Sequence, residues 1–176
     1  MKLVDPDEKY LDGYEQAYLM ALKKISLGEM KKHNLTFKNP KEVDIVKDAY
    51  DRRDLKKLKP GYVPSYDYFL IDDKENFIGK ISIRIGLTES LLKHAGNIGY
   101  GINPLYWNKG YGNKILELGL KQAKHLGLKH KVLVTCDDDN IASAKIIEKN
   151  GGILQDVIEN NVEDEYILTR RYWIYL

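Results

Sequence analysis

The sequence has little of what marks secreted or membrane proteins. One cysteine, Cys136, stands among its 176 residues. This excludes an internal disulfide framework and agrees with a reducing compartment, so a cytoplasmic location is expected. No apolar run reaches the roughly 20 residues of a membrane span, and residues 1–24 interrupt their apolar positions with acids and lysines, unlike a signal peptide. No membrane partner is therefore expected.

An excess of either charge is also absent. Lys and Arg number 28 and Asp and Glu 26, giving a formal net charge of +2, which is too balanced for bulk attraction to nucleic acid. The mixed run at 51–59, "DRRDLKKLK", is typical of a solvated helix face. The four histidines show no metal-ligand spacing. The sequence therefore predicts no metal site and no nucleic-acid partner.

The order of predicted elements indicates one compact domain over residues 1–176. Helices are expected at 10–28, 40–58, 113–127 and 140–152, strands at 65–73, 76–87, 97–103, 131–136, 153–159 and 165–176, and loops at 88–96 and 160–164. In the second strand, isoleucines alternate with Lys80, Ser82 and Arg84, which predicts a half-buried strand. This order suits a mixed α/β domain built on one sheet.

A cationic glycine turn, "KGYGNK", lies at the start of the third helix, at 109–114. The first backbone N–H groups of a helix have no intrahelical partners, and together with the helix dipole they attract anions. Glycines allow close backbone approach, and Lys109 and Lys114 add positive charge. The turn lacks the Lys-Ser/Thr ending of a P-loop and the third glycine of the dinucleotide fingerprint. The expected ligand is therefore a phosphate-containing molecule of another class than those bound by these two loops.

The run from Gly99 to Gly152 resembles the core of the GNAT superfamily of N-acetyltransferases. In that family a strand leads to an Arg/Gln-x-x-Gly-x-Gly/Ala loop and a long helix, followed by a strand and an Asn-capped helix; here these parts are "IGYGINP", "WNKGYG", "NKILELGLKQAKHLG", "KVLVTC" and "NIASAKIIEKNGG". The resemblance implies an α+β fold with a central, mostly antiparallel twisted sheet flanked by helices. It also implies a coenzyme-binding core at about 97–152.

The resemblance further implies that acetyl-coenzyme A is bound largely by backbone, as a co-substrate without a metal. The residues that it assigns to cofactor binding form three groups. They are Gly101, Ile102 and Asn103 beside the pantetheine arm, Lys109, Gly110, Tyr111, Gly112, Asn113 and Lys114 around the pyrophosphate, and Asn140 and Ser143 on the first turn of the last helix. Asn140 is independently expected to cap that helix.

By the same resemblance, a neutral amine attacks the thioester directly, and a backbone N–H near Ile102 stabilises the oxyanion. Two positions depart from the family pattern. Trp107 stands where Arg or Gln is usual, so the polar contribution of that side chain is expected to be missing. Ile147 stands where many members have a tyrosine that protonates the leaving thiolate. Three alternatives follow from this isoleucine. Another group protonates the thiolate, the thiolate leaves without a proton, or the chain binds the cofactor with little catalysis.

The general base is not fixed by the sequence. The candidates are Glu89, His94, Tyr100 and the run Asp137–Asp139, of which Tyr100 lies on the predicted central strand and Glu89 could also attract a cationic amine. Cys136 has no histidine placed to activate it, so a buried structural thiol is favoured over a nucleophile.

Three functions stay open at this point. The favoured one is transfer of acetyl from acetyl-coenzyme A to a primary amine of a small molecule or protein. A non-catalytic coenzyme-binding or regulatory module is the alternative, and a nucleic-acid-binding domain that uses "KGYGNK" is disfavoured by the charge balance. The aromatic tail at 171–176 fits a core or edge strand or a dimer surface, so both monomer and homodimer stay open.

Overall fold

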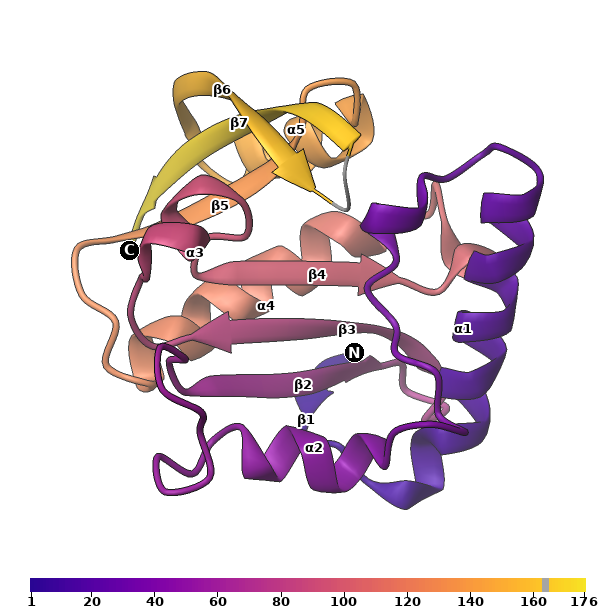
Figure 1. Ribbon diagram of the computed structural model, residues 1–176. Coiled ribbons are helices and arrows are strands. Elements are labelled where there is room, and N and C mark those ends of the chain that lie inside the picture. Colours follow the sequence, from indigo (N-terminus) through magenta and orange to yellow (C-terminus); the bar gives the residue numbers. More distant parts are fainter. Residues whose placement is uncertain (163–164) are drawn as a thin grey trace.

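The computed structural model describes residues 1–162 and 165–176, and these form a seven-stranded sheet in the order β1-β2-β3-β4-β5-β7-β6. Its strands are β1 (Lys2–Val4), β2 (Ser65–Ile71), β3 (Phe77–Arg84), β4 (Ile98–Ile102), β5 (Lys131–Asp137), β6 (Ile153–Val162) and β7 (Glu165–Tyr175). Neighbouring strands are antiparallel except β4 and β5, which are parallel (Figure 1). The sheet is therefore mostly antiparallel, as predicted.

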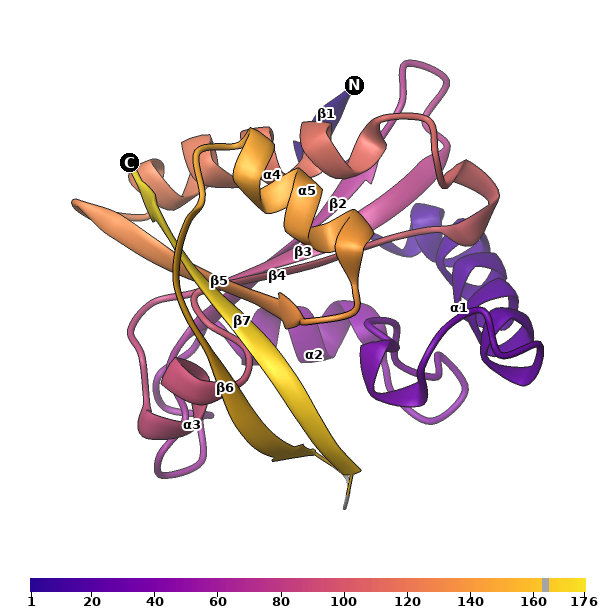
Figure 2. The ribbon, with the colours of Figure 1, turned by 90° about the horizontal axis from the view of Figure 1, so that it is seen from above.

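Helices cover both faces of the sheet. α4 (Tyr111–His125) and α5 (Ile141–Lys149) lie on one face, and α1 (Leu11–Ser26) and α2 (Ile45–Asp51) lie on the other (Figure 2). The short elements are η1 (Glu8–Tyr10), η2 (Lys32–Asn34), α3 (Glu89–Lys93) and η3 (Pro104–Tyr106). α4 connects the parallel pair β4 and β5, which is the connection that parallel strands require.

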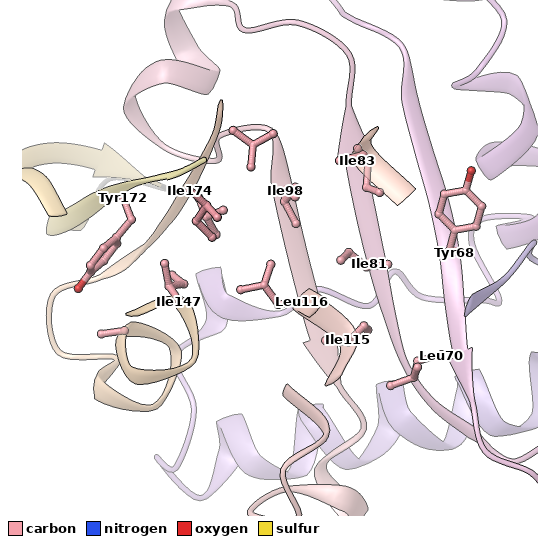
Figure 3. Packing of buried hydrophobic residues seen from close by; sticks show 14 of the residues in the cluster. Tyr68, Leu70, Ile81, Ile83, Ile98, Ile115, Leu116, Ile147, Tyr172 and Ile174 are labelled. Atoms are coloured by element: carbon pink, nitrogen blue, oxygen red, sulfur yellow. The ribbon is translucent and has the colours of Figure 1, made fainter. Parts of the chain in front are cut away.

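The main core lies between the sheet and the α4–α5 layer. Ile115 and Leu116 of α4 and Ile147 of α5 are fully buried against Ile81 and Ile98 of the sheet (Figure 3). The buried positions of α4, at 115, 116, 119 and 123, and those of α5, at 144 and 147, recur at three- and four-residue intervals, so each helix turns one face to the strands. This packing fixes where both helices begin, and both beginnings line the cleft described below.

A smaller aromatic core lies under α1. The ring of Tyr14 sits 5.6 Å from Phe37, 5.6 Å from Phe69 and 5.5 Å from Phe77, measured between centroids. Its hydroxyl accepts a hydrogen bond of 2.9 Å from the backbone N–H of Lys38. The chain that follows α1 is thereby held across the sheet face opposite α4.

Three local expectations were wrong. The helix expected at 40–58 is shorter, because the Asp44 side chain accepts from the Lys47 N–H and starts the helix at Ile45. The loop expected at 88–96 contains α3, capped by Thr88, whose hydroxyl accepts from the Leu91 N–H. Strand β6 continues through Val162 into the loop expected at 160–164, whose residues 163–164 lie outside the described residues. β1 was not predicted; its three residues are too few for a periodic signal.

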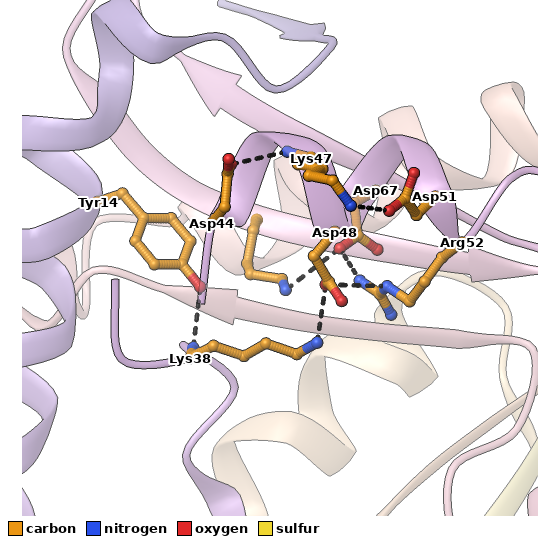
Figure 4. Close-up of polar contacts among 9 residues, drawn as sticks. Tyr14, Lys38, Asp44, Lys47, Asp48, Asp51, Arg52 and Asp67 are labelled. Atoms are coloured by element: carbon orange, nitrogen blue, oxygen red, sulfur yellow. Dashed lines mark hydrogen bonds and ion pairs between the residues drawn. The ribbon is translucent and has the colours of Figure 1, made fainter. Parts of the chain in front are cut away.

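Strand β3 is buried on both faces, which corrects the half-buried expectation. Lys80 and Ser82 are 8% and 7% exposed, and the Lys80 ammonium lies 3.5 Å from the carboxylate of Asp67 on β2. Arg52, beyond the end of α2, binds the same carboxylate and lies 3.2 Å from Asp48 (Figure 4). Buried charges occur where they are paired, so this network explains how lysine enters a covered strand face.

Candidate active site

Strand β4 leaves β5 after a single ladder position. In the part of the chain that the structure describes, the two strands pair at Ile98 and Val134 alone. The preceding Asn97 strengthens this junction, because its N–H donates to the Leu133 carbonyl and its side-chain oxygen accepts from the Leu133 N–H. Beyond Ile98 the two strands separate, and β4 presents an edge toward β5.

The backbone of Tyr100 and Ile102 faces that edge. The Asn103 N–H bonds the Ile78 carbonyl of β3, and antiparallel strands alternate residues that face the partner with residues that face away. Gly101 therefore points its N–H and C=O toward β3, whereas Tyr100 and Ile102 point theirs away from it. The Ile102 carbonyl is taken by the Trp107 indole N–H, and we call the remaining groups, the N–H and C=O of Tyr100 and the N–H of Ile102, the free edge of β4.

The glycine turn leads into the first turn of α4, and two residues at its beginning have left-handed backbone. Asn108 and Gly110 have φ of 58° and 81°, and left-handed residues of this kind turn successive N–H groups toward one point. α4 begins directly afterwards, at Tyr111. We call 108–113 the phosphate loop, after the group that the sequence predicts there. Gly110 meets the conformational need, whereas Gly112 meets a packing need, because a Cβ there would lie 2.4 Å from Cδ1 of Ile146 on α5.

The free edge and the phosphate loop line one cleft of about 870 Å³. Four segments surround it: 28–34 after α1, 100–102 on β4, 106–113 around the phosphate loop, and 139–146 at the start of α5. Nine predicted site residues line it, namely Tyr100, Gly101, Ile102, Gly110, Tyr111, Gly112, Asn113, Asn140 and Ser143. Segments far apart in the sequence thus meet where the family pattern was recognised.

Four other predicted site residues are placed outside the lining. Asn103 is fully buried, and its side chain accepts from the Leu105 N–H. The Lys109 ammonium donates to the Leu105 carbonyl over 3.2 Å, and Lys114 pairs with Glu117 at 3.0 Å. Glu89 is exposed on α3 and pairs with Lys93 at 2.9 Å.

Trp107, which departs from the family pattern, makes a polar contact of its own. Its indole N–H donates a hydrogen bond of 2.9 Å to the carbonyl of Ile102, so the polar group of this side chain contacts the end of β4. Ile147 points into the core, and Ser143, one turn earlier on α5, lines the cleft in its place.

Three segments of the Gly99–Gly152 pattern therefore meet at one cleft. Comparisons with known proteins show the family to which the pattern belongs. The family described as "Acetyltransferase (GNAT) domain" matches residues 17–153, most of the chain. The chain belongs to the GNAT family of acetyltransferases.

This GNAT protein is also similar to one curated relative and to solved structures. The N-acetyltransferase YnaD of Bacillus subtilis is 36% identical over 63 residues, which cover 34% of this chain and 35% of YnaD. The chain thus spans about a third of the length of the curated relative it matches.

The structural matches extend over nearly the whole chain. A GNAT acetyltransferase of Bacillus anthracis has a TM-score of 0.71 at 18% identity, covering 98% of this chain and 93% of that one. RimL, a ribosomal L7/L12 α-N-protein acetyltransferase solved with coenzyme A, has a TM-score of 0.72 at 16% identity, covering 99% and 93%. At such identities the likeness shows the fold alone. The predicted family and the predicted α+β fold are confirmed.

In this GNAT domain the hydroxyls of Tyr100 and Ser143 lie together on the cleft wall, 3.1 Å apart. Burial raises the pKa of Tyr100 far above its usual value, so this hydroxyl stays protonated at neutral pH. A protonated phenol donates hydrogen bonds and cannot act as a general base. Asn140 caps α5 by accepting from the Ser143 N–H at 3.1 Å, which confirms the predicted cap.

Of the three aspartates considered as bases, Asp137 and Asp139 hold the segment after α1, and Asp138 holds β7. Asp137 bonds His33 at 2.7 Å and Asn34 at 2.8 Å. Asp138 accepts from Arg170 of β7 at 2.7 Å, and Asp139 pairs with Lys31 at 2.6 Å. The run therefore ties the segment after α1 to the end of β5. His33 and Asn34 were not found from the sequence, because nothing local reveals a contact with a residue more than 100 positions away.

Cys136 and His94 lie outside the cleft lining. Burial raises the pKa of the Cys136 thiol to about 12, which agrees with the structural thiol that the sequence favoured. His94 ends α3, and its backbone carbonyl accepts from the Thr135 hydroxyl at 2.6 Å. Among the described residues, no cluster of three or more His, Cys, Asp or Glu could hold a metal ion, and no helix is long and apolar enough to cross a membrane.

Proposed function

We propose that this GNAT protein transfers the acetyl group of acetyl-coenzyme A to a primary amine by direct attack on the thioester. The observation that carries the proposal is the joining of the free edge of β4 and the phosphate loop in one cleft. An amide-containing arm with a pyrophosphate at one end needs both features at once. Belonging to the GNAT family and the coenzyme A in the RimL structure support the same ligand.

The residues of the cleft fit such a ligand. N–H groups of Gly110, Tyr111 and Gly112, with the positive end of the α4 dipole, face an anion. The backbone of Ile102 and Tyr100 offers hydrogen bonds to an extended chain, as an edge strand does. An arm that starts at the phosphate loop passes Ile102 before it reaches Tyr100, so its thioester end lies near the Tyr100–Ser143 hydroxyl pair.

The chain's own groups then have distinct tasks. A backbone N–H of the free edge, from Ile102 or Tyr100, stabilises negative charge on the thioester oxygen. The paired hydroxyls of Tyr100 and Ser143 donate hydrogen bonds to the sulfur as it gains charge, and the thiolate leaves without a proton because a thiol pKa is about 8.5. Ile147 has neither the chemistry nor the position for this contact. The acceptor is a small-molecule or protein amine. RimL acts on a protein according to its name, but at 16% identity this likeness decides nothing about the acceptor here.

Calorimetry and a thiol-release assay test the proposal. We expect the purified protein to bind coenzyme A and to release thiol from acetyl-coenzyme A with at least one member of a panel of polyamines, amino acids and peptides. Tyr100→Phe combined with Ser143→Ala should lower kcat by roughly 100-fold, the scale of lost hydrogen-bond donors to developing charge. Ser26→Ala, an exposed serine on α1, is the matched control. Failure to bind coenzyme A refutes the proposal, and binding without turnover on any amine favours the non-catalytic module.

A further inference from the structure

Trp107 connects the two halves of the cleft. Its indole N–H reaches the Ile102 carbonyl over 2.9 Å, and Ile102 also carries an N–H of the free edge of β4. The residue after it, Asn108, is the first left-handed residue of the phosphate loop. The indole therefore lies where the strand edge ends and the loop begins.

The turn between these halves is crosslinked from within. The Asn103 side chain accepts from the Leu105 N–H at 3.1 Å, and the Tyr106 N–H bonds the Asn103 carbonyl at 2.8 Å. The Trp107–Ile102 bond closes the turn from one end to the other. On its outer side the indole ring lies 5.8 Å from the Lys24 ammonium of α1, so a helix of the opposite layer supports it.

We propose that Trp107 is a positioning residue that fixes the free edge of β4 relative to the phosphate loop, so that one extended ligand meets both. The inference rests on the proposed function, because coenzyme A is the ligand taken to span the two halves. A ligand that bridges two sites binds more tightly when their separation is already set, since less freedom is lost on binding. A ligand that touches one half gains nothing from the connection.

This difference gives a test that needs no turnover. Trp107→Phe keeps an aromatic ring and removes the N–H, whereas Trp107→Gln keeps a side-chain N–H. Trp173→Phe is the matched control, because Trp173 lies on β7 outside the cleft lining and donates to Gln155. Each protein is titrated calorimetrically with coenzyme A and with 3′,5′-ADP, which carries the nucleotide and no pantetheine arm, and its thermal unfolding is recorded.

We expect Trp107→Phe to weaken coenzyme A binding by roughly tenfold, the scale of one hydrogen bond, with 3′,5′-ADP binding and Tm close to those of Trp173→Phe. Trp107→Gln should bind coenzyme A more tightly than Trp107→Phe. Equal weakening of both ligands would place the effect in the phosphate loop and overturn the inference, as would unchanged binding of both. If wild type and Trp173→Phe both fail to bind coenzyme A, the proposed function falls, and this inference with it.

Discussion

Replacing Asp67 by Asn tests whether the buried charge network holds α2 to the sheet. The Asp67 side chain is 5% exposed and faces Lys80 and Arg52. Removing one partner of a buried pair costs about 3–5 kcal/mol. The lower end applies here, because Arg52 keeps Asp48 as a partner. A loss near 3 kcal/mol lowers the Tm of a domain of this size by roughly 6–12 °C.

The pH dependence of the same variant is a second measure. Burial alone would raise the pKa of Asp67, but the charges of Lys80 and Arg52 outweigh it and hold the pKa below its usual value. A carboxyl whose folded pKa is lowered stabilises the protein above its unfolded pKa, near 3.9, and loses this contribution as pH falls through the folded value. The stability difference between wild type and Asp67→Asn should therefore be constant from about pH 5 to 8 and shrink below about pH 4.

Urea unfolding at a series of pH values measures both effects. The control is Asp48→Asn, whose carboxylate is 28% exposed in its pairs with Lys38 and Arg52 and should contribute less than about 1 kcal/mol. Equal losses of unfolding free energy in Asp67→Asn and Asp48→Asn would refute the conclusion that the more buried Asp67 contributes more than Asp48. A difference for Asp67→Asn that persists unchanged at pH 2 would refute the electrostatic explanation.

Three further predictions concern single positions. Gly101→Ala should destabilise by about 1–3 kcal/mol in urea unfolding, because its Cβ would lie 1.8 Å from Oγ1 of Thr36; Gly99→Ala, whose Cβ would lie 3.4 Å from the Arg84 guanidinium, should lose less, and equal losses would contradict the reasoning. Cys136, with its raised pKa, should react with iodoacetamide at pH 8 at least about 100-fold more slowly in the native than in the unfolded protein, and comparable rates would show an accessible thiolate. Glu89→Gln should leave kcat near that of wild type, because Glu89 lies outside the cleft lining; a loss of about 100-fold would support the general base that the sequence suggested.

The sequence predicted the parts of the site that depend on local pattern. The glycine turn and the Asn140 cap leave signals within a few residues, and the helices that follow them carry a clear apolar period. These segments line the side of the cleft that we propose binds the cofactor. The family resemblance joined them in the right order, so the fold could be predicted from about a third of the chain.

Contacts between distant segments could not be predicted in this way. Lys80 indicated a solvent-facing side of β3, because nothing near it in the sequence reveals that Asp67 stands beside it on β2. The contact of His33 with Asp137 spans 104 positions, so the wall formed by the segment after α1 has no local signal. The late start of the helix expected at 40–58 has a different, local reason, since Asp44 looked like one more surface acid and is the cap that accepts from the Lys47 N–H.

The junction at Asn97 has a consequence for how the molecule opens. Strands β1–β4 and β5–β7 are two half-sheets that meet at one ladder pair, and Asn97 adds its side chain to that seam by bonding Arg84 and Leu133. Amide hydrogen exchange should therefore resolve the two halves as separate cooperative units, with the Asn97 and Leu133 N–H groups, whose bonds cross the seam, exchanging when the halves part and before the core strands of either half. The gap that admits a ligand is also the line along which the sheet comes apart, so a ligand bound there would act as a missing strand and make the two halves unfold together.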